Sequence, residues 1–307
     1  MTELAPLPEG PPKRIVFLGT PAMAVPCLEA LVANGFDVAL VVSRADKRRG
    51  RGAELAASPV KAAAERLGLA VSHQVDDVLT VGAELGVVVA FGQLIRPNVL
   101  EQLPMVNLHF SLLPRWRGAA PVERALLAGD EVTGVCLMQV DVGLDTGDVI
   151  DRVEVPIGSR VTINDLRRRL VDVGAAQLVD NLTRGLRPGV EQIGEATYAA
   201  KLDPSELAID WSRPAIEIDR LVRLGVAWTM FRGKRLKVLG VELDERTGAA
   251  GALLDPLTVG CWDGSLVLDR VQPEGKPAMA AQAWANGAHP LSGEQFGQSL
   301  SADADIS

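Results

Sequence analysis

Asn107 and His109 are the residues of this sequence whose types and spacing could do chemistry on a carbonyl carbon. They lie two positions apart in the stretch V-N-L-H-F-S-L-L-P-R-W-R-G-A-A-P, residues 106–121. In an extended strand, residues i and i+2 point to the same face, so an amide and an imidazole would project side by side. A half-buried strand with two polar residues on its wet face would show the same spacing. The spacing alone leaves both interpretations open.

A group of carboxylates could supply a partner for that imidazole. Four aspartates lie within eleven residues after a predicted strand: Asp141, Asp145, Asp148 and Asp151. We expect one of them to meet His109 at the carboxyl edge of the sheet, where open α/β folds bind ligands. The simpler alternative is an acidic, Gly-rich turn. An aspartic protease would need two such carboxylates on all-β lobes, and the spacing does not match a calcium loop.

The remaining histidines do not compete for this role. His73 and His289 have no polar partner that the sequence makes evident, which leaves His109 as the candidate for acid–base work near neutral pH.

The composition is that of a globular chain. With 307 residues it predicts about two domains. Its three cysteines are odd in number and widely spaced in apolar surroundings, which argues against disulfides or a zinc site. No secretory signal and no membrane-spanning run is evident. We therefore expect a cytoplasmic protein with buried thiols.

The first half alternates short apolar runs with helical segments. Predicted strands at 14–19, 36–42, 86–90, 105–110 and 134–140 are interspersed with predicted helices at 22–34, 60–67 and 121–128. This pattern predicts an α/β fold with a doubly wound, mostly parallel, Rossmann-like sheet. The first strand is followed by T-P-A-M-A and lacks G-x-G-x-x-G, so a nicotinamide-dependent enzyme is poorly supported.

The second half changes character. After a long amphipathic helix at 162–184, residues 188–206 are rich in Gly, Pro and polar residues and predict a linker. Short strands at 227–231, 235–243, 258–262 and 265–271 then predict a small OB-like β-barrel. The expected organisation is a disordered leader (1–13), a catalytic domain (14–187), the linker, and a C-terminal domain (207–307) with a mobile tail beyond about Gly287.

Two basic clusters stand out against the net charge of −8. The segment 43–52, S-R-A-D-K-R-R-G-R-G, follows the second predicted strand and is expected to be a long loop. The second cluster lies at the head of a barrel strand. Each could be a solvated surface or a contact for nucleic-acid phosphate. The candidate residues are Arg44, Lys47, Arg48, Arg49, Arg51, Lys234, Arg235 and Lys237.

Several ordered motifs together resemble the methionyl-tRNA formyltransferase family over most of residues 14–285. The motifs are F-L-G-T-P (17–21), G-R-G (50–52), S-P-V-K (58–61), A-F-G (90–92), N-L-H-F-S-L-L-P-R-W-R-G-A-A-P (107–121), G-L-D-T-G-D (143–148), T-Y-A (197–199), I-D-W (209–211) and F-R-G-K-R-L-K-V (231–238). The block S-L-L-P-R-W-R-G-A-A-P is highly specific to this family among folate-dependent formyltransferases.

The resemblance implies transfer of a formyl group from 10-formyltetrahydrofolate, a co-substrate, to the α-amino group of methionyl initiator tRNA. It implies a catalytic trio of Asn107, His109 and Asp145, and a tRNA contact through the basic loop with Arg51. It also implies folate contacts from Ser111, Leu112, Leu113 and Pro114. We expect no metal, no membrane and a monomer. The loop departs from the family by lacking both of its usual prolines.

Two other classes remain open at this point. A sugar-nucleotide N-formyltransferase would share the folate donor and the catalytic trio, but would not be expected to need the basic loop or a lysine-rich barrel. A non-catalytic tRNA- or RNA-binding protein would use the basic clusters but has no reason to carry the trio. An assay with both kinds of acceptor separates them.

Overall fold

The structure is a computed structural model that describes residues 4–49 and 54–297. The chain forms two compact units, each described here by itself. Unit 1 comprises Met1–Ala125, Glu131–Ile157 and Asp165–Ala200. Unit 2 comprises Leu126–Asp130, Gly158–Asn164 and Lys201–Ser307. Two short segments that precede the predicted domain boundary therefore cluster with unit 2.

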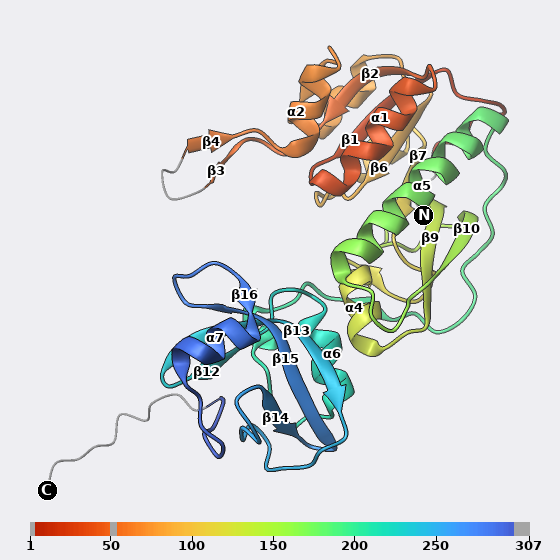
Figure 1. The fold of residues 1–307 in the computed structure, drawn as a ribbon. Coiled ribbons are helices and arrows are strands. Elements are labelled where there is room, and N and C mark those ends of the chain that lie inside the picture. The colour runs from red at the N-terminus through yellow and green to blue at the C-terminus, as the bar shows by residue number, and fades with distance from the viewer. Residues whose placement is uncertain (1–3, 50–53, 298–307) are drawn as a thin grey trace, which may run out of the picture. The chain divides into compact units, whose positions relative to one another are not determined.

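The described strands of unit 1 build a seven-stranded sheet in the order β10-β9-β7-β6-β1-β2-β5 (Figure 1). Five of them run parallel, and β9 is antiparallel to both of its neighbours. The parallel strands are β1 (Arg14–Gly19), β2 (Asp37–Val42), β5 (Val71–Ser72), β6 (Leu85–Val89) and β7 (Met105–His109). The antiparallel edge consists of β9 (Val132–Gln139) and β10 (Val149–Pro156). The predicted α/β fold class is confirmed.

Shorter elements and helices complete the path from Arg14 to Ala199. The helices are α1 (Val25–Ala33), α2 (Pro59–Arg66), α3 (Pro97–Leu100), α4 (Pro121–Ala128) and α5 (Ile163–Arg184), with 3-10 turns η1 (Ala22–Ala24) and η2 (Val75–Thr80). Two small two-stranded sheets pair β3 (Lys47–Arg49) with β4 (Glu54–Ala56), and β8 (Arg117–Gly118) with β11 (Tyr198–Ala199).

Local sequence accounts for these elements. The run Ile15–Leu18 in β1 is fully buried, as expected of a parallel strand covered on both faces. Helix α2 begins as predicted: the Ser58 hydroxyl accepts a hydrogen bond from the Lys61 N–H at 3.0 Å, and Pro59 occupies the first helical position.

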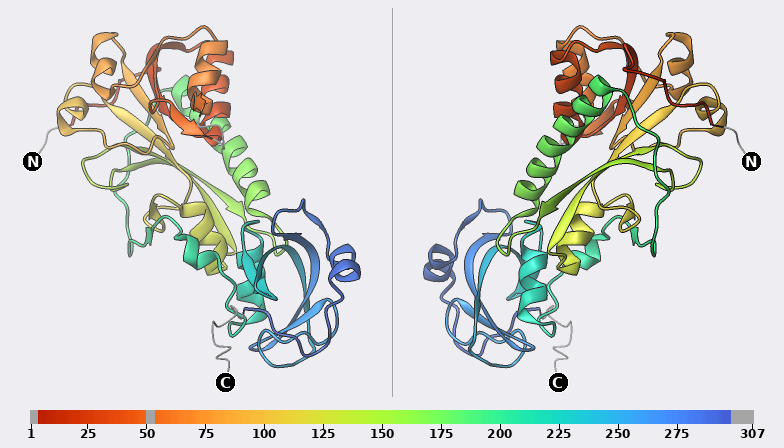
Figure 2. Two further views of the ribbon diagram at one scale, coloured as in Figure 1. Left: turned by 90° about the vertical axis from the view of Figure 1, so that its left-hand side faces the viewer. Right: turned by 90° about the vertical axis from the view of Figure 1, so that its right-hand side faces the viewer.

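Helix α5 covers one face of the β7–β9 part of the sheet (Figure 2). At the contact, Gly174 lies so close to the sheet that a Cβ there would be 2.8 Å from Leu108 Cδ2 and 3.3 Å from Val135 Cγ1. Because neighbouring residues of a strand alternate faces, Asn107 and His109 lie on the opposite face from Leu108. Helix α5 therefore does not cover the face that carries the two polar side chains.

The N-terminal segment differs from the disordered leader that the sequence predicted. The Ala5 N–H donates to the Leu100 carbonyl at 2.9 Å, and Leu4 packs on the core formed around Val99 and Met105. The backbone of Gly10 lies against Gly185, where a Cβ would be 3.3 Å from the Gly10 carbonyl carbon. Residues 4–13 are packed because their apolar side chains find partners that composition alone does not reveal, and residues 1–3 lie outside the described part.

Unit 2 is built on an antiparallel sheet in the order β12-β13-β15-β14, with β16 paired to β15. The strands are β12 (Trp228–Phe231), β13 (Lys234–Asp244), β14 (Thr258–Cys261), β15 (Gly264–Pro273) and β16 (Met279–Ala280). The other elements are η3 (Pro204–Leu207), α6 (Ala215–Val222) and α7 (Ala281–Ala288). The sheet and its two helices enclose one apolar core, which confirms the predicted small β domain.

The C-terminal segment also differs from its prediction. Phe296 is 4% exposed and packs between Trp211 and Phe231, with ring centroids 5.7 and 5.0 Å away. Phe296 therefore anchors the described residues after Gly287 to the core of unit 2, instead of leaving them as a mobile tail. An apolar residue beyond a Gly- and Pro-rich stretch gave no periodic signal that would have shown this. Residues 298–307 lie outside the described part.

None of the helices in residues 4–49 and 54–297 combines the length and hydropathy that crossing a bilayer requires. The three cysteines are buried and unpaired, as predicted. Burial raises the pKa of the Cys27 and Cys261 thiols to about 12, so neither is a thiolate near neutral pH.

Candidate active site

Strand β7 presents Asn107 and His109 on one face, as predicted. Opposite them on β9 lie Met138, paired with Asn107, and Cys136, paired with His109. His109 is 5% exposed, whereas Asn107 is half-buried. The Asn107 amide makes no hydrogen bond to any side chain or backbone group in the described part of the chain. It is therefore available to a substrate.

Both ring nitrogens of His109 have partners. Nε2 lies 2.9 Å from the Trp116 carbonyl oxygen, which can only accept, so Nε2 carries a proton. Nδ1 lies 3.6 Å from Asp145 Oδ2. The same carboxylate oxygen accepts a hydrogen bond from the Gly118 N–H at 2.7 Å. The imidazole is thus held by a backbone carbonyl on one side and faces the predicted aspartate on the other.

Asp145 reaches His109 by a different route from the one predicted. We expected the contact at the carboxyl edge of the sheet, where His109 ends β7, but the preceding strand β9 runs antiparallel to β7. The Val140 N–H bonds to the Met105 carbonyl, so the loop 141–148 starts beside the amino end of β7 and folds back toward His109. Asp145 itself adopts a left-handed backbone conformation with φ 52°. The predicted contact between His109 and an aspartate is present at the carboxyl end of β7, but the loop that carries Asp145 starts at the other end of that strand.

The segment predicted as a linker takes part in this site. The Thr197 hydroxyl accepts a hydrogen bond from the Trp116 N–H at 2.9 Å, and Tyr198 pairs in register with Arg117. Gln192 donates to the backbone of the Asp145 loop. The sequence analysis named Thr197 and Tyr198 only as part of the T-Y-A motif and did not name Gln192. It missed the contacts of all three because nothing local ties residues 190–199 to a motif that lies about 80 positions earlier.

The segment Ser111–Pro114 is packed into the protein. Ser111 and Leu113 are buried, and the Ser111 hydroxyl donates to the Arg115 carbonyl at 2.6 Å. Leu112 packs on Gly134, where a Cβ would be 2.4 Å from Leu112 Cδ2. The peptide bond before Pro114 is cis. The side chains of Ser111, Leu112 and Leu113 thus support the segment, and its predicted contact with folate stays a prediction.

Cys136 lies under this segment but is not a nucleophile. Its burial raises the pKa of the thiol, which outweighs the opposite effect of hydrogen bonds from Leu113 and Arg152. Arg152 also donates to the Leu113 carbonyl at 2.8 Å. Because only the thiolate attacks carbonyl carbons effectively, covalent catalysis through Cys136 is not supported.

The first basic cluster follows β2 and is not only a loop. Lys47–Arg49 pairs antiparallel with Glu54–Ala56, so the predicted long loop contains a short hairpin. Its base is held by a 2.6 Å hydrogen bond between the buried Ser43 and Ser58 hydroxyls. Of the predicted contacts, Arg51 lies outside the described residues, and the side chains of Lys47, Arg48 and Arg49 are not described.

Arg44 lies at the base of this hairpin. Its guanidinium is close to Gly92 of the A-F-G motif, where a Cβ would be 3.4 Å from Arg44 Nη2. Nearby, Lys61 Nζ bonds to Asp46 Oδ2 at 2.8 Å, which raises the pKa of the lysine. His73 Nδ1 lies 2.9 Å from the Ser43 carbonyl, so His73 does have a polar partner. These contacts fix where the hairpin leaves unit 1.

The second basic cluster lies on β13 in unit 2. The Arg235 guanidinium stacks 4.0 Å from the centre of the Trp228 ring. Arg235 and Lys237 line a pocket of about 210 Å³ together with Gln272, Pro273, Glu274 and Gly275. Lys234 is exposed at the start of the strand. A guanidinium on an indole ring beside a lysine is an arrangement that can bind phosphate and stack on a base.

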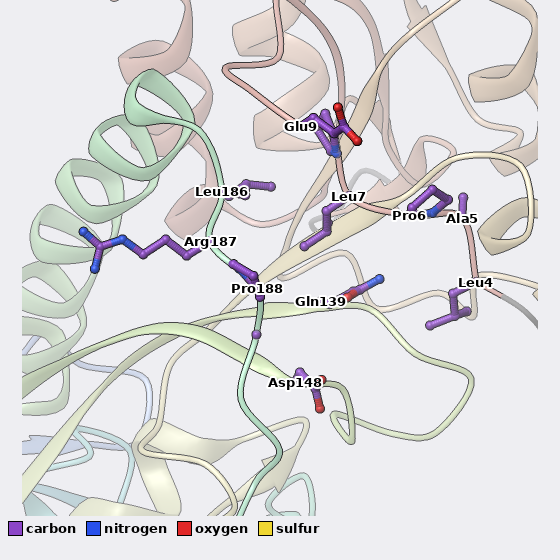
Figure 3. Close-up of a pocket in the computed structure, with 12 residues that line it drawn as sticks. Leu4, Ala5, Pro6, Leu7, Glu9, Gln139, Asp148, Leu186, Arg187 and Pro188 are labelled. Atoms are coloured by element: carbon purple, nitrogen blue, oxygen red, sulfur yellow. The ribbon is translucent and has the colours of Figure 1, made fainter.

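A larger pocket of about 540 Å³ lies in unit 1 away from His109 (Figure 3). It is lined by the N-terminal segment 4–9, by Leu186–Gly189, and by Gln139 and Asp148. Gln139 pairs with Val106 at the amino end of β7, whereas His109 is at the carboxyl end. The pocket therefore is not part of the proposed catalytic cluster.

The two units match two family models. The model described as "Formyl transferase" matches residues 13–182, and "Formyl transferase, C-terminal domain" matches residues 201–289. Fold and site thus define a two-domain formyl transferase. A methionyl-tRNA formyltransferase of Dinoroseobacter shibae is 47% identical over 285 residues, covering 87% of this chain and 95% of the relative. One from Jannaschia sp. (strain CCS1) is 46% identical, with 90% and 97% covered. The chain belongs to the methionyl-tRNA formyltransferase family.

Solved structures share the fold at low identity. A methionyl-tRNA formyltransferase from Clostridium thermocellum has a TM-score of 0.56 at 15% identity, covering 85% of this chain and 97% of that one. An N-formyltransferase from Helicobacter canadensis, in complex with folinic acid and dTDP-3-aminofucose, has a TM-score of 0.65 at 18% identity, with 85% and 99% covered. These likenesses concern the fold alone.

Proposed function

We propose that this chain transfers the formyl group of 10-formyltetrahydrofolate to the α-amino group of methionyl initiator tRNA. The observation that carries the proposal is the arrangement of Asn107, His109 and Asp145. An amide without a partner among the described residues lies beside an imidazole that faces a carboxylate at 3.6 Å. Membership in a family whose relatives are 46–47% identical over most of their length supports the same reaction.

Asn107 and His109 act on the oxygen of the formyl group. When the amine nitrogen forms its bond to the formyl carbon, negative charge develops on that oxygen. The Asn107 amide N–H can donate to it, and so can His109 Nδ1 when the ring is an imidazolium that carries a proton on both nitrogens. Preorganised donors of this kind typically contribute about 10²–10³ in rate each. Since Nε2 is bound to the Trp116 carbonyl, the proton that reaches the substrate is the one on Nδ1.

Asp145 handles the proton that the amine loses. Its Oδ2 is occupied by the Gly118 N–H, and the carboxylate faces His109 Nδ1. It accepts the amine proton, directly or through water, while the bond from the formyl carbon to the donor nitrogen breaks and that nitrogen takes up a proton. General acid–base help of this type contributes about 10²–10⁴ in rate. All three residues come from unit 1 of a single chain, so the proposal requires no second copy.

The basic clusters are the proposed contacts for tRNA. The cluster after β2 begins at Arg44, which lies against the A-F-G motif, and continues into the hairpin strand with Lys47, Arg48 and Arg49. Arg51 belongs to the same basic cluster of the sequence and lies outside the described residues. The cluster on β13 offers Lys234, Arg235 and Lys237, with Arg235 stacked on Trp228. Clustered cations bind phosphate even on a chain whose net charge is negative.

The acceptor assay tests the proposal. The full chain is incubated with 10-formyltetrahydrofolate and either charged initiator tRNA or a dTDP-linked amino sugar, and formylated product is quantified. We expect formylation of the tRNA only, and loss of that product in His109→Ala. Formylation of the amino sugar alone would make the chain a sugar-nucleotide N-formyltransferase. RNA binding without any formylation would make it a non-catalytic binding protein.

A further inference from the structure

Gln192 uses every hydrogen-bonding position of its side-chain amide. Its Nε2 donates to the Asp145 carbonyl at 2.9 Å and to the Gly147 carbonyl at 2.8 Å. Its Oε1 accepts from Arg117 Nε at 3.1 Å and from Arg117 Nη2 at 2.7 Å. An amide has two N–H donors and two acceptor lone pairs, so all four are satisfied. The partners also fix which end is nitrogen, because carbonyls only accept and a guanidinium only donates.

The loop that Gln192 holds has few other restraints. Val142 and Leu144 on it are 50% and 62% exposed, so apolar burial contributes little to its position. Asp145 has a φ of 52°, a left-handed conformation that costs a non-glycine residue energy and persists only when neighbours enforce it. The conformation of the loop therefore depends on the hydrogen bonds that Gln192 donates to the Asp145 and Gly147 carbonyls.

One strand pair supplies both restraints on Asp145. Arg117–Gly118 pairs with Tyr198–Ala199 as β8 and β11. The Gly118 N–H donates to the Asp145 carboxylate, while the Arg117 guanidinium orients the amide of Gln192. Strand β8 thus holds the side chain of Asp145 directly, through Gly118, and its backbone indirectly, through Arg117 and Gln192.

We propose that Gln192 is a positioning residue for formyl transfer, which holds the Asp145 backbone so that its carboxylate faces His109 Nδ1, with Arg117 fixing the amide. This inference rests on the role of Asp145 in the proposed function. Gln192 acts through Asp145 and not on the reacting atoms. A simpler role would be to anchor residues 188–197 to Arg117, without consequence for the aspartate.

Two substitutions separate these roles. Gln192→Leu removes all four hydrogen bonds at similar size. Gln192→Glu keeps an acceptor for Arg117, now as an ion pair, but cannot donate to the two loop carbonyls. If positioning is the role, both variants lower kcat by about 10–10² with a KM change of at most a few fold, because misplacement of about 1 Å costs that much. If anchoring is the role, Gln192→Glu restores activity and overturns the proposal.

A matched control uses Gln102, whose Nε2 donates to the Asn98 carbonyl at 2.8 Å on the surface of unit 1. Gln102→Leu removes a glutamine–carbonyl hydrogen bond of the same kind that does not involve the aspartate loop. We expect kcat to be unchanged in this variant. Thermal melts of all variants show whether a loss of activity follows from unfolding.

A double-mutant cycle distinguishes failure of this inference from failure of the proposed function. In an Asp145→Ala background, Gln192→Leu should cause no further fall in kcat, because the residue it positions is gone. Additive losses in a chain that needs Asp145 would overturn the positioning role while leaving the proposed function intact. Full activity of Asp145→Ala alone would instead contradict the catalytic role of the aspartate and the inference with it.

Discussion

His109 is a residue whose chemistry is set by a backbone carbonyl. The Trp116 carbonyl binds Nε2, which directs Nδ1 at Asp145. Trp116 has a φ of 64°, and its N–H bonds to Thr197. The tautomer of the proposed acid–base residue is therefore determined by the RWRG turn and not by the strand that carries the histidine.

Asp145→Asn tests the charge of the aspartate without removing its hydrogen bond. The asparagine carbonyl can still accept from the Gly118 N–H, so the loop should keep its position. We expect kcat to fall by about 10²–10⁴ because an amide cannot take up the amine proton. Steady-state kinetics with tRNA as acceptor measure this. A fall of less than a few fold in a folded variant would contradict a role in proton transfer.

Glu294 gives unit 2 a pH-dependent contribution to stability. The hydrogen bond from Arg232 holds the pKa of this carboxyl below its ordinary value of 4.5, helped by the Leu291 N–H. A depressed folded pKa means that the stabilisation is present above pH 4.5 and lost as the pH falls through the folded value. The difference in Tm between the parent chain and Glu294→Gln should therefore be largest at pH 7 and vanish in acid.

The Tm difference between the parent chain and Glu294→Gln is measured from melting curves between pH 7 and about pH 3. This interval includes the range over which carboxyl groups ordinarily titrate. Glu101→Gln is the control, since Glu101 is exposed and forms no ion pair with another described residue. Its Tm should follow that of the parent at every pH. A Tm difference for Glu294→Gln that does not change with pH would refute the claim that ionisation of Glu294 stabilises unit 2.

Residue types and spacing indicated Asn107, His109 and one aspartate of residues 141–151, and the family resemblance selected Asp145. Neither showed which residues surround these three. N-x-H within an apolar run is visible in the sequence because a strand alternates faces, and the aspartate-rich segment is visible from its composition. The partners Trp116, Gly118 and Gln192 act through backbone groups or from a segment without periodicity. Such contacts depend on tertiary approach, which the local pattern does not encode.

At the scale of elements, the sheet was predictable except at its antiparallel edge. Four of the five parallel strands are continuous apolar runs, and their predicted bounds agree with the structure to within about one residue. No bounds were predicted for the two-residue strand β5. Strand β10 was missed, although V-E-V-P alternates as a half-covered strand does. The sequence also could not show that β9 is antiparallel to β7, because a continuous apolar run is expected for a buried strand of either direction. The sequence therefore did not show that the loop carrying Asp145 starts beside the amino end of β7.

Gly147 is where the aspartate loop passes closest to β9. A Cβ at Gly147 would lie 1.9 Å from the Gln139 carbonyl oxygen, which is backbone and cannot yield easily. Gly147→Ala should therefore displace the loop, lower kcat by about 10² through misplacement of Asp145, and cost about 1–3 kcal/mol of stability. Kinetics and denaturant titration measure the two effects.

The control for that substitution is Gly158→Ala, because a Cβ at Gly158 would meet no atom within 4 Å. Activity and stability of this variant should match the parent chain. If Gly147→Ala behaved like Gly158→Ala, the close approach of the loop to β9 would not be a restraint on Asp145.

At the scale of the whole molecule, each unit closes its core with a terminal segment that composition had assigned to disorder. Residues 4–13 pack onto unit 1, and Phe296 completes the aromatic cluster of unit 2 with Trp211, Phe231 and Trp284. Both segments lack periodicity because they are irregular chain that packs on an existing core. Their apolar residues therefore contribute to stability without forming a helix or a strand of their own.

Shortening the chain tests this for unit 2. A chain that ends at Ala288 loses Phe296, whereas one that ends at Gly297 keeps it; we expect a clear fall in Tm only for the first. Phe296→Ala in the full chain should cost about 3–5 kcal/mol, the usual range for a buried phenylalanine. Leu291→Ala, at a residue 65% exposed, should change stability by less than about 0.5 kcal/mol. Equal stability of the two shortened chains would mean that residues 289–297 do not stabilise the core. The buried aromatic ring of Phe296 would then contribute nothing to the stability of unit 2.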